Sequence, residues 1–377
     1  MITIKEVTTK RQLKRFINYP VRLYKGVKEF TPYLYEDEIS NLTPEKNPAF
    51  EYCDFKLFLA YRDRKIVGRI CGIISHYANK KYKRKRVRFN RIDMIDDIEV
   101  TKALLNAVAK WGKEKGMTEI VGPLGYSDQD KEGLLIEGFE YHNMFVTFYH
   151  FPYYHEHLVK LGFVEDAVWN EHRITIPKKI DPRWHRVSEF VKEKYNVRML
   201  KLKNKGKVLQ NRVVDVLSLV NRAYKDLYGY VPIKEEQMHH LAKQYVPLIN
   251  LRYLHLVVDK DDKLVAFGLS IPSPVFALKR IKGKLYPFGF VRFLWALRKS
   301  KHLDLLLIAI EPELQNTGII NLVLLEALEH AVEDGIEYAE TGPQLTTNKE
   351  ANDLWKHLEY VTHKKRACFV RKIKNGF

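Results

Sequence analysis

Residues 305–320 read Leu-Leu-Leu-Ile-Ala-Ile-Glu-Pro-Glu-Leu-Gln-Asn-Thr-Gly-Ile-Ile. The six apolar residues at the start have the length of a strand, and the apolar spacing of residues 320–332 is that of a helix. A strand that enters a glycine-containing turn and then a helix presents unpaired backbone N–H groups, which form an anion site. Gly318 matters because only glycine tolerates a close approach of a phosphate to the backbone. The stretch therefore predicts a strand, a phosphate-type loop and a helix.

The order of elements around this stretch occurs twice in the chain. Residues 57–75 and 254–272 each read as two β-branched strands around a charged turn, which is a hairpin signature. Each half continues with a strand, a helix and a strand that ends in Gly-Pro, at Gly122-Pro123 and at Gly342-Pro343. We therefore predict a duplicated fold whose halves are joined by a short linker at 176–182, which is bracketed by two prolines.

The two strand-to-helix turns differ in length and charge. Ile95 to Pro123 spans 29 residues, whereas Ile310 to Pro343 spans 34, and the five extra residues fall in the turn itself. The first turn, residues 95–100, has no glycine and carries three carboxylates, which would repel a pyrophosphate. The first half is therefore interpreted as a degenerate copy that binds no such group.

Residues 315–320, Gln-Asn-Thr-Gly-Ile-Ile, resemble the coenzyme A pyrophosphate motif of the GNAT acyltransferases, Gln/Arg-x-x-Gly-x-Gly/Ala, although Ile320 replaces the second small residue. Longer stretches are similar to a group of bacterial proteins with paired GNAT domains. These stretches cover nearly the full length and lie at residues 19–24, 46–50, 122–127, 132–139, 152–154, 161–163 and 286–289.

The resemblance implies an α/β fold of the α+β type, with two tandem GNAT-like domains at residues 1–177 and 183–377. Each would hold a mixed, mostly antiparallel sheet flanked by helices. It also implies acetyl-CoA or a longer acyl-CoA as co-substrate and a small-molecule amine as acceptor. The expected cofactor-binding residues are Ile310, Gln315, Asn316, Thr317, Gly318, Ile319, Ile320 and Asn348.

Acyl transfer to an amine needs a group that takes the amine proton and, in many members of the family, a tyrosine that protonates the leaving thiolate. Asn348 and Leu354 match the family's helix, but Trp355 stands at the tyrosine position, and an indole is a poor proton donor. Glu311 and Glu340 are the candidate bases; the alternative for each is a surface carboxylate that balances nearby lysines. Two hypotheses therefore remain: an N-acyltransferase, or a non-catalytic protein that binds acyl-CoA or another ligand.

The first half carries an insertion between residues 123 and 161 that is rich in histidine, carboxylates and aromatic residues. Its spacing does not suit a metal site, and we predict none. The insertion is interpreted either as a wall that receives a cationic amine or an apolar chain, or as a packed excursion over the domain junction.

The net charge is +18, and many cations occur in bursts such as residues 80–86 and 279–284. Such a field attracts anionic partners, here an acyl carrier protein or an anionic membrane surface; the alternative is an ordinary solvated surface. A basic, aromatic stretch around Phe288–Arg298 would lie on such a partner or close an acyl tunnel. No nucleic-acid reader motif occurs, so nucleic acid is not expected. Three cysteines at unrelated spacings and no membrane-length apolar run predict a cytoplasmic protein.

Overall fold

The computed structural model describes residues 1–127, 130–204, 206–246 and 249–373. The first half of the chain forms seven strands and five helices in these ranges: β1 (Ile2–Glu6), α1 (Lys10–Leu23), α2 (Tyr35–Asn41), β2 (Cys53–Arg62), β3 (Lys65–Ser75), α3 (His76–Lys81), β4 (Arg86–Met94), α4 (Ile98–Glu114), β5 (Glu119–Gly122), β6 (Leu134–Glu137), α5 (Tyr153–Lys160) and β7 (Val164–Thr175).

The second half repeats the order strand, strand, strand, helix, strand, with two helices between its second and third long strands where the first half has one. Its described elements are α6 (Pro182–Tyr195), β8 (Arg198–Met199), α7 (Lys207–Ala223), α8 (Glu235–Tyr245), β9 (Leu254–Val258), β10 (Leu264–Pro272), α9 (Val275–Ile281), α10 (Gly289–Arg298), β11 (His302–Ile310), α11 (Ile320–Glu333), β12 (Tyr338–Thr341), β13 (Gln344–Leu345), α12 (Lys349–Asp353) and β14 (Tyr360–Lys372).

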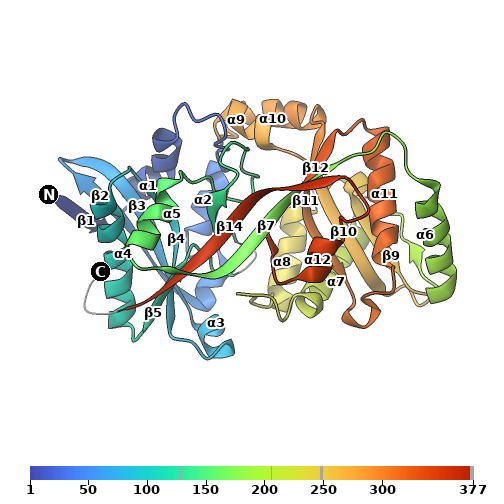
Figure 1. The fold of residues 1–377 in the computed structure, drawn as a ribbon, viewed down its shortest axis with the longest axis horizontal. Coiled ribbons are helices and arrows are strands. Elements are labelled where there is room, and N and C mark those ends of the chain that lie inside the picture. Colours follow the sequence, from blue (N-terminus) through green and yellow to red (C-terminus); the bar gives the residue numbers. More distant parts are fainter. Residues whose placement is uncertain (128–129, 205, 247–248, 374–377) are drawn as a thin grey trace.

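One sheet runs through both halves, in the order β1-β2-β3-β4-β5-β14-β7-β12-β11-β10-β9-β8 (Figure 1). The pairs β4–β5 and β11–β12 are parallel, and the other recorded pairs are antiparallel. The mixed, mostly antiparallel sheet that the sequence predicts is thus confirmed. Two parallel pairs at equivalent places reflect the repeated strand–helix–strand unit, because a helix crossover returns the chain in the same direction.

Each half contributes one long strand to the other half's sheet. β14, the last strand of the chain, pairs with β5, whereas β7 pairs with β12. The two exchanged strands also pair with each other from Tyr360↔Ile174 to Val370↔Val164, and they cross the middle of the molecule as red and green ribbons in Figure 1. The linker expected at 176–182 lies between β7 and α6, and each of the expected ranges, 1–177 and 183–377, places its last long strand beside a strand of the other range.

Helices cover both faces of the sheet. In the first half α4 packs on one face, with Leu104, Val108 and Trp111 fully or almost fully buried, while α1 packs on the other through Phe16. In the second half α6 and α11 cover one face and α7 covers the other. The helical apolar stripes predicted at residues 100–115 and 320–332 are therefore the core-facing sides of α4 and α11.

Candidate active site

The parallel strands β11 and β12 separate part-way along their length. They pair from His302↔Tyr338 to Leu305↔Thr341, and the bond from the Gly342 N–H to the Leu305 carbonyl (3.2 Å) is the last recorded one between them. At the same level the pairing of β11 with β10 skips one residue, Leu306, which forms a β-bulge. From Leu306 onward, no strand among the described residues pairs with β11 on the β12 side. Such bulges and unpaired edges concentrate at binding sites.

The side chains of β11 confirm that this edge is open. Leu305, Leu306, Leu307 and Ile308 are only partly buried, although β11 lies in the middle of the sheet. A central strand covered by helices on both faces is normally buried throughout. We call the region beyond Leu305, where β11 and β12 have separated beside the partly buried Leu305 to Ile308, the slot.

The loop that follows β11 lies at the mouth of this slot. Asn316 and Gly318 have positive φ angles of 61° and 83°, and α11 begins at Ile320 with no side chain capping its first turn. The Thr317 hydroxyl donates to the Leu314 carbonyl and weakly accepts from the Ile319 N–H at 3.4 Å. Among the described contacts the backbone N–H groups of Gly318 and Ile320 have no partner. They are the groups at which the sequence predicts an anion site.

The other residues expected at the cofactor lie around the same slot. Asn348 accepts from the Ala351 N–H at 3.1 Å and so caps α12, while the Asn316 amide approaches Glu350 of α12 at 3.5 Å. The loop therefore lies next to α12. Gln315 and Ile310 are partly exposed beside them.

Trp355 is buried on the α11 side of the slot. Its ring packs against Leu324 and Ile308, and its N–H donates to the Gln344 side chain at 3.2 Å. The indole therefore fills the position where the family's helix carries a tyrosine. A phenol is nevertheless present, because the Tyr224 hydroxyl, from the end of α7, donates to the Ile308 carbonyl at 2.9 Å. Sequence reasoning missed Tyr224, since it lies 84 residues before Ile308.

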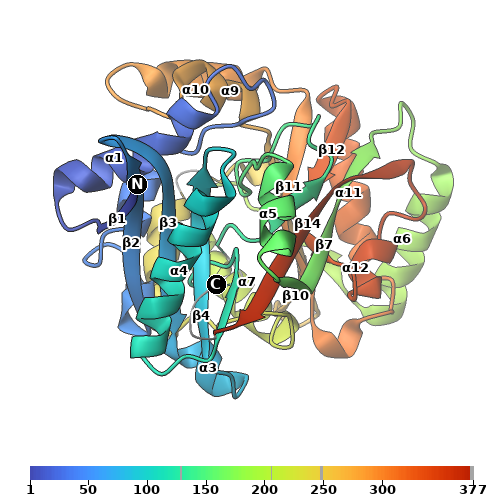
Figure 2. The ribbon, with the colours of Figure 1, turned by 60° about the vertical axis from the view of Figure 1, so that its left-hand side comes forward.

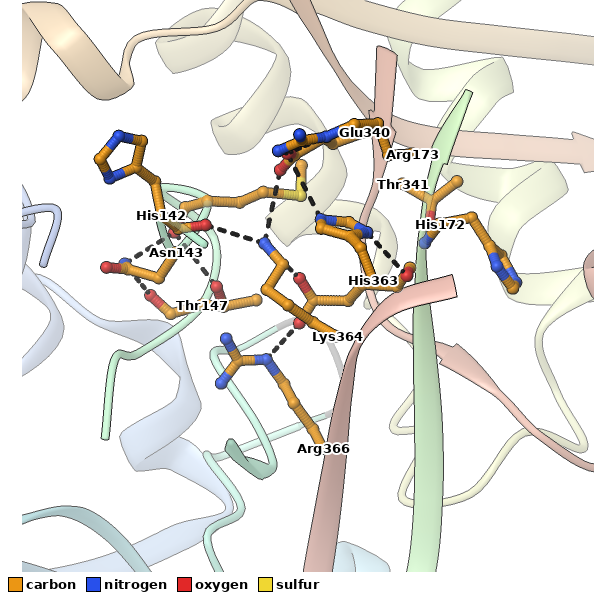
Figure 3. Close-up of polar contacts among 12 residues, drawn as sticks. His142, Asn143, Thr147, His172, Arg173, Glu340, Thr341, His363, Lys364 and Arg366 are labelled. Atoms are coloured by element: carbon orange, nitrogen blue, oxygen red, sulfur yellow. Dashed lines mark hydrogen bonds and ion pairs between the residues drawn. The ribbon is translucent and has the colours of Figure 1, made fainter. Parts of the chain in front are cut away.

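A buried ionic network lies where the exchanged strands β7 and β14 run beside β12 (Figure 3). Lys364 of β14 contacts Glu171 at 2.9 Å and Glu340 at 3.4 Å, and Arg173 also binds Glu340 at 2.8 Å. Arg366 pairs with Glu171 from the other side. The network draws its members from the exchanged strands β7 and β14 and from β12. It therefore exists only because the two halves share those strands.

Glu340, one of the two expected bases, is held as a carboxylate by this network. Burial alone would raise its pKa, but Lys364, His363 and Arg173 together hold the pKa well below its usual range. A carboxylate with a strongly lowered pKa is a weak proton acceptor. The structure thus places Glu340 beside the slot, in an environment that suits a fixed negative charge.

Glu311, the other expected base, ends β11 beyond the slot. It is buried and paired with Arg222 at 2.7 Å and with Lys263 at 3.4 Å. Burial raises the pKa of Glu311, but Arg222 and Lys263 together lower it by more. The pKa therefore lies below its usual value. These contacts tie α7 and β10 to the end of β11, as a structural ion pair does.

A third carboxylate, which sequence reasoning missed, lies beside Glu340. Asp304 of β11 is the direct neighbour of Glu340 in the parallel pairing and is 2% exposed. Burial raises its pKa to about 7, and a hydrogen bond with Ser273 only partly offsets that effect. One oxygen of its carboxylate has no recorded hydrogen-bond partner. The signal in the sequence is a carboxylate inside the apolar strand His302–Ile310.

The corresponding slot of the first half is closed. Leu124 N–H still donates to the Phe89 carbonyl (2.9 Å) beyond the end of β5, and a Cβ on Gly122 would meet that carbonyl at 2.2 Å. A Cβ on Gly342 would meet only the Leu305 carbonyl, at 3.9 Å. Further along β4, the Tyr153 and Tyr154 hydroxyls bond to the carbonyl and N–H of Met94.

The first turn of α4, the helix that follows β4, is capped by a carboxylate of the chain itself. The Asp97 carboxylate accepts from the Glu99 N–H at 2.9 Å and pairs with Arg62, which lowers its pKa. Within the insertion, Phe151 packs against Tyr153 and against Tyr24 of the first half, whereas Tyr126 and Asp130 line a cavity. In the part of the chain that the structure describes, no group of three His, Cys, Asp or Glu side chains could hold a metal ion.

Comparisons with known proteins agree with this architecture. No protein-family model matches the chain. The tandem GNAT protein of the clavulanic acid biosynthesis pathway superimposes with a TM-score of 0.59 at 9% identity, over the full length of both chains. This chain has the tandem GNAT fold. A GCN5-related N-acetyltransferase from Sphaerobacter thermophilus gives a TM-score of 0.51 at 9% identity, over 100% of this chain and 97% of that one.

Two curated proteins are related to this tandem GNAT chain in sequence. Protein YghO of Escherichia coli K12 is 25% identical over 379 residues, which cover 98% of this chain and 95% of that protein. The bacterial ceramide synthase of Caulobacter vibrioides is 27% identical over 302 residues, which cover 79% of this chain and 77% of that protein. The predicted resemblance to tandem GNAT proteins is thus confirmed for the fold.

Proposed function

We propose that this protein is an acyl-CoA-dependent N-acyltransferase whose donor binds in the second half. The observation that carries the proposal is the open edge of β11 beyond Leu305, with the uncapped loop at Gly318 at its mouth. The equivalent strand of the first half is paired and capped over the same stretch. One acyl-CoA would therefore bind per chain.

The order of features along β11 matches the order of chemical groups along an acyl-CoA. The pyrophosphate would bind the N–H groups of Gly318 and Ile320, where the helix dipole also favours negative charge. The pantetheine chain carries amide groups, and it would add to the free edge of β11 from Leu306 to Ile310 as an extra strand does. Its thioester would then lie beside β11 between Leu305 and Ile308, with Asp304 towards one end of this stretch and the Tyr224 hydroxyl at the other.

The reaction would form a bond between the amine nitrogen and the acyl carbon and break the bond between that carbon and sulfur. The proton that the amine loses would pass to Asp304, which is deprotonated above about pH 7. The thiolate would take a proton from the Tyr224 hydroxyl, which lies on the same strand edge at Ile308. Glu340 would stay ionised and position the side chains around Asp304.

The acceptor would be a long-chain amine. A ceramide is an amide of a fatty acid with a long-chain amino alcohol, and a relative that spans most of this chain is named a bacterial ceramide synthase. The walls of the slot are apolar, with Leu305 to Ile308 partly exposed, which favours apolar chains over polar substrates.

The test is to incubate the purified protein with palmitoyl-CoA and sphinganine, and to measure both the amide and the free thiol. We expect equal amounts of the two products, and calorimetry should give one coenzyme A site per chain. An acyl carrier protein charged with the same chain is tested as an alternative donor. Binding of palmitoyl-CoA without any amide from sphinganine or other long-chain amines would favour the non-catalytic binding protein.

A further inference from the structure

The surface of α9 and α10 exposes more large apolar side chains than any other described part of the molecule. Of the seventeen large hydrophobic residues recorded as exposed, seven lie between residues 276 and 295. Phe288 and Val291 are 75% and 71% exposed, and Trp295 is 49% exposed. α10 itself has no buried residue. Monomeric proteins rarely expose such a cluster unless it binds something.

The same segment carries only positive charge. Residues 263–303 contain no aspartate or glutamate, and eight of the cations lie between residues 275 and 301. Two of them flank the exposed indole, because Lys299 lies 4.1 Å and Arg280 5.3 Å from the centre of the Trp295 ring. Apolar and aromatic side chains surrounded by lysine and arginine are typical of a helix in a membrane interface.

The segment is firmly attached to the body of the protein. α9 buries Val275, Leu278 and Ile281, and α10 packs on α9. The Tyr35 N–H donates to the Gly283 carbonyl at 2.8 Å, which ties the segment to the first half of the chain. Both views of the ribbon show α9 and α10 side by side at the top of the molecule (Figures 1 and 2). The exposed apolar side chains are therefore presented outward by a fixed platform.

We propose that α9 and α10 bind the surface of an anionic phospholipid bilayer. The apolar side chains would enter the acyl boundary while the cations contact lipid phosphates. Closure of an acyl tunnel, the alternative weighed from the sequence, would bury the side chains that the structure exposes. No described helix is long and apolar enough to cross a membrane, so contact would be limited to the interface.

This surface is connected to the network at the strand junction. The ring of Phe276 contacts His302, which stacks on Tyr338 at 3.9 Å, and Arg173 covers the other side of Tyr338. His302 begins β11, whereas the loop at Gly318 follows its other end, roughly 25 Å away. A lipid amine would thus approach from the membrane side, and a soluble acyl-CoA from the opposite end.

The test measures co-sedimentation of the full-length protein with vesicles of phosphatidylcholine, with and without phosphatidylglycerol. We expect binding only to the anionic vesicles, weakened by salt, because the screening length falls from about 10 Å at 0.1 M to about 3 Å at 1 M. Changing Lys282, Lys284 and Lys299 to Gln should lower the affinity roughly 100-fold. Changing Phe288, Val291 and Trp295 to Ser should abolish binding.

The matched control changes Lys83, Arg84 and Lys85 to Gln. These three residues are exposed and carry the same total charge as Lys282, Lys284 and Lys299. They are not surrounded by a cluster of exposed apolar side chains like that of α10. The control should bind like the wild type. Equal loss in the control, or no sedimentation of the wild-type protein with anionic vesicles, would overturn the proposal. So would a dimer without lipid that the Phe288, Val291 and Trp295 changes dissociate, because a second copy would then be the occupant.

Fluorescence gives a direct readout of depth. Trp295 is exposed, Trp184 is partly buried and lies on α6, and Trp111, Trp169 and Trp355 are buried, so brominated lipids should quench Trp295. Trp295→Phe should keep vesicle binding but lose that quenching. Vesicle binding is measured without substrates, so it is independent of acyl transfer: a protein that sediments but makes no amide contradicts the proposed function alone, and an active protein that does not sediment contradicts the membrane surface alone.

Discussion

The strands β4 and β11 occupy equivalent places in the two halves and differ in what lies along their edges. Phe89 to Met94 of β4 are all buried, and the edge is closed by Leu124, Tyr153 and Tyr154. In the described part of the chain, the edge of β11 from Leu306 to Ile310 has no strand paired on the β12 side; the Tyr224 hydroxyl bonds to Ile308, and Trp355 packs against the same residue. The difference shows that a repeated backbone does not imply a repeated site, because side chains supplied from elsewhere decide whether the gap between the strands is filled.

The polar residues differ in the same way. Counted back from the Gly-Pro of each half, Asp304 and Glu340 correspond to the paired residues Val87 and Ile120. The first half therefore has a hydrocarbon pair where the second has two carboxylates. An unpaired carboxylate in such a buried position costs free energy, and its retention at only one of the two junctions points to chemistry there.

The largest expected effect is at Asp304. Asp304→Asn keeps the size of the side chain but removes its ability to take a proton. It should lower kcat/KM by about 10²- to 10⁴-fold while coenzyme A affinity stays unchanged. The wild-type rate should rise with pH through about 7, and the variant should lose that rise. Glu340→Gln and Glu311→Gln are the comparisons; if Glu340→Gln instead removes the pH dependence, Glu340 is the base, as the sequence suggested.

The same substitution has a predicted effect on stability. The pKa of Asp304 is about 7 in the folded chain and near 4 when unfolded, so the folded state holds the extra proton between those values. The free energy of unfolding of the wild type should therefore fall, relative to Asp304→Asn, as pH rises from about 4 to about 7. Urea denaturation of both proteins at several pH values measures this difference. Parallel pH curves would show that Asp304 is not buried in its neutral form.

The next largest effect concerns the loop. Gly318→Glu should lower coenzyme A affinity by roughly 100-fold or more, because a like charge and a side chain would enter the anion site. The thermal stabilisation by coenzyme A, about 2.7 kcal/mol at 100 times the dissociation constant, should disappear. Gly335→Glu is the matched control, since Gly335 also has positive φ (64°) and ends the same helix α11. Equal binding by both variants would refute the loop assignment.

A smaller effect is expected at Tyr224. Tyr224→Phe removes the hydroxyl that bonds to Ile308 and should lower kcat about tenfold with KM for acyl-CoA nearly unchanged. Pre-steady-state measurements of thiol release should show that this step is slower in the variant than in the wild type. A rise in KM with unchanged kcat would show that Tyr224 only shapes the slot.

The smallest effect on function is expected in the first half. Changing Tyr153 and Tyr154 to Phe should destabilise the fold by about 1 to 3 kcal/mol, because Met94 loses its hydrogen-bond partners. Calorimetry should still find one coenzyme A per chain. A second site in this variant would mean that the tyrosines alone had been blocking a competent copy, against the interpretation of the first half as degenerate.

Local patterns in the sequence determined the repeated strand–helix–strand unit, the two helices after β4 and β11, and the difference between the two turns. They could do so because hydrophobic period, glycine placement and turn length act over a few neighbouring residues. Gly318, Ile320 and Asn348 were predicted to bind one cofactor, and the structure places Asn316 of the same loop within 3.5 Å of Glu350 on the helix that Asn348 caps. Glu311 was placed at the end of its strand, although its pairing with Arg222 could not be foreseen.

The tertiary structure alone decided the rest. The exchange of β7 and β14 joins segments far apart in the chain, and no local pattern specifies which edge a strand joins. Asp304 reads as one polar residue in an apolar strand, and only burial beside Glu340 raises its pKa to about 7. Tyr224 reaches β11 across 84 residues. Packing and dielectric environment depend on these long-range contacts, so the proton acceptor and donor proposed here were invisible until the chain was folded.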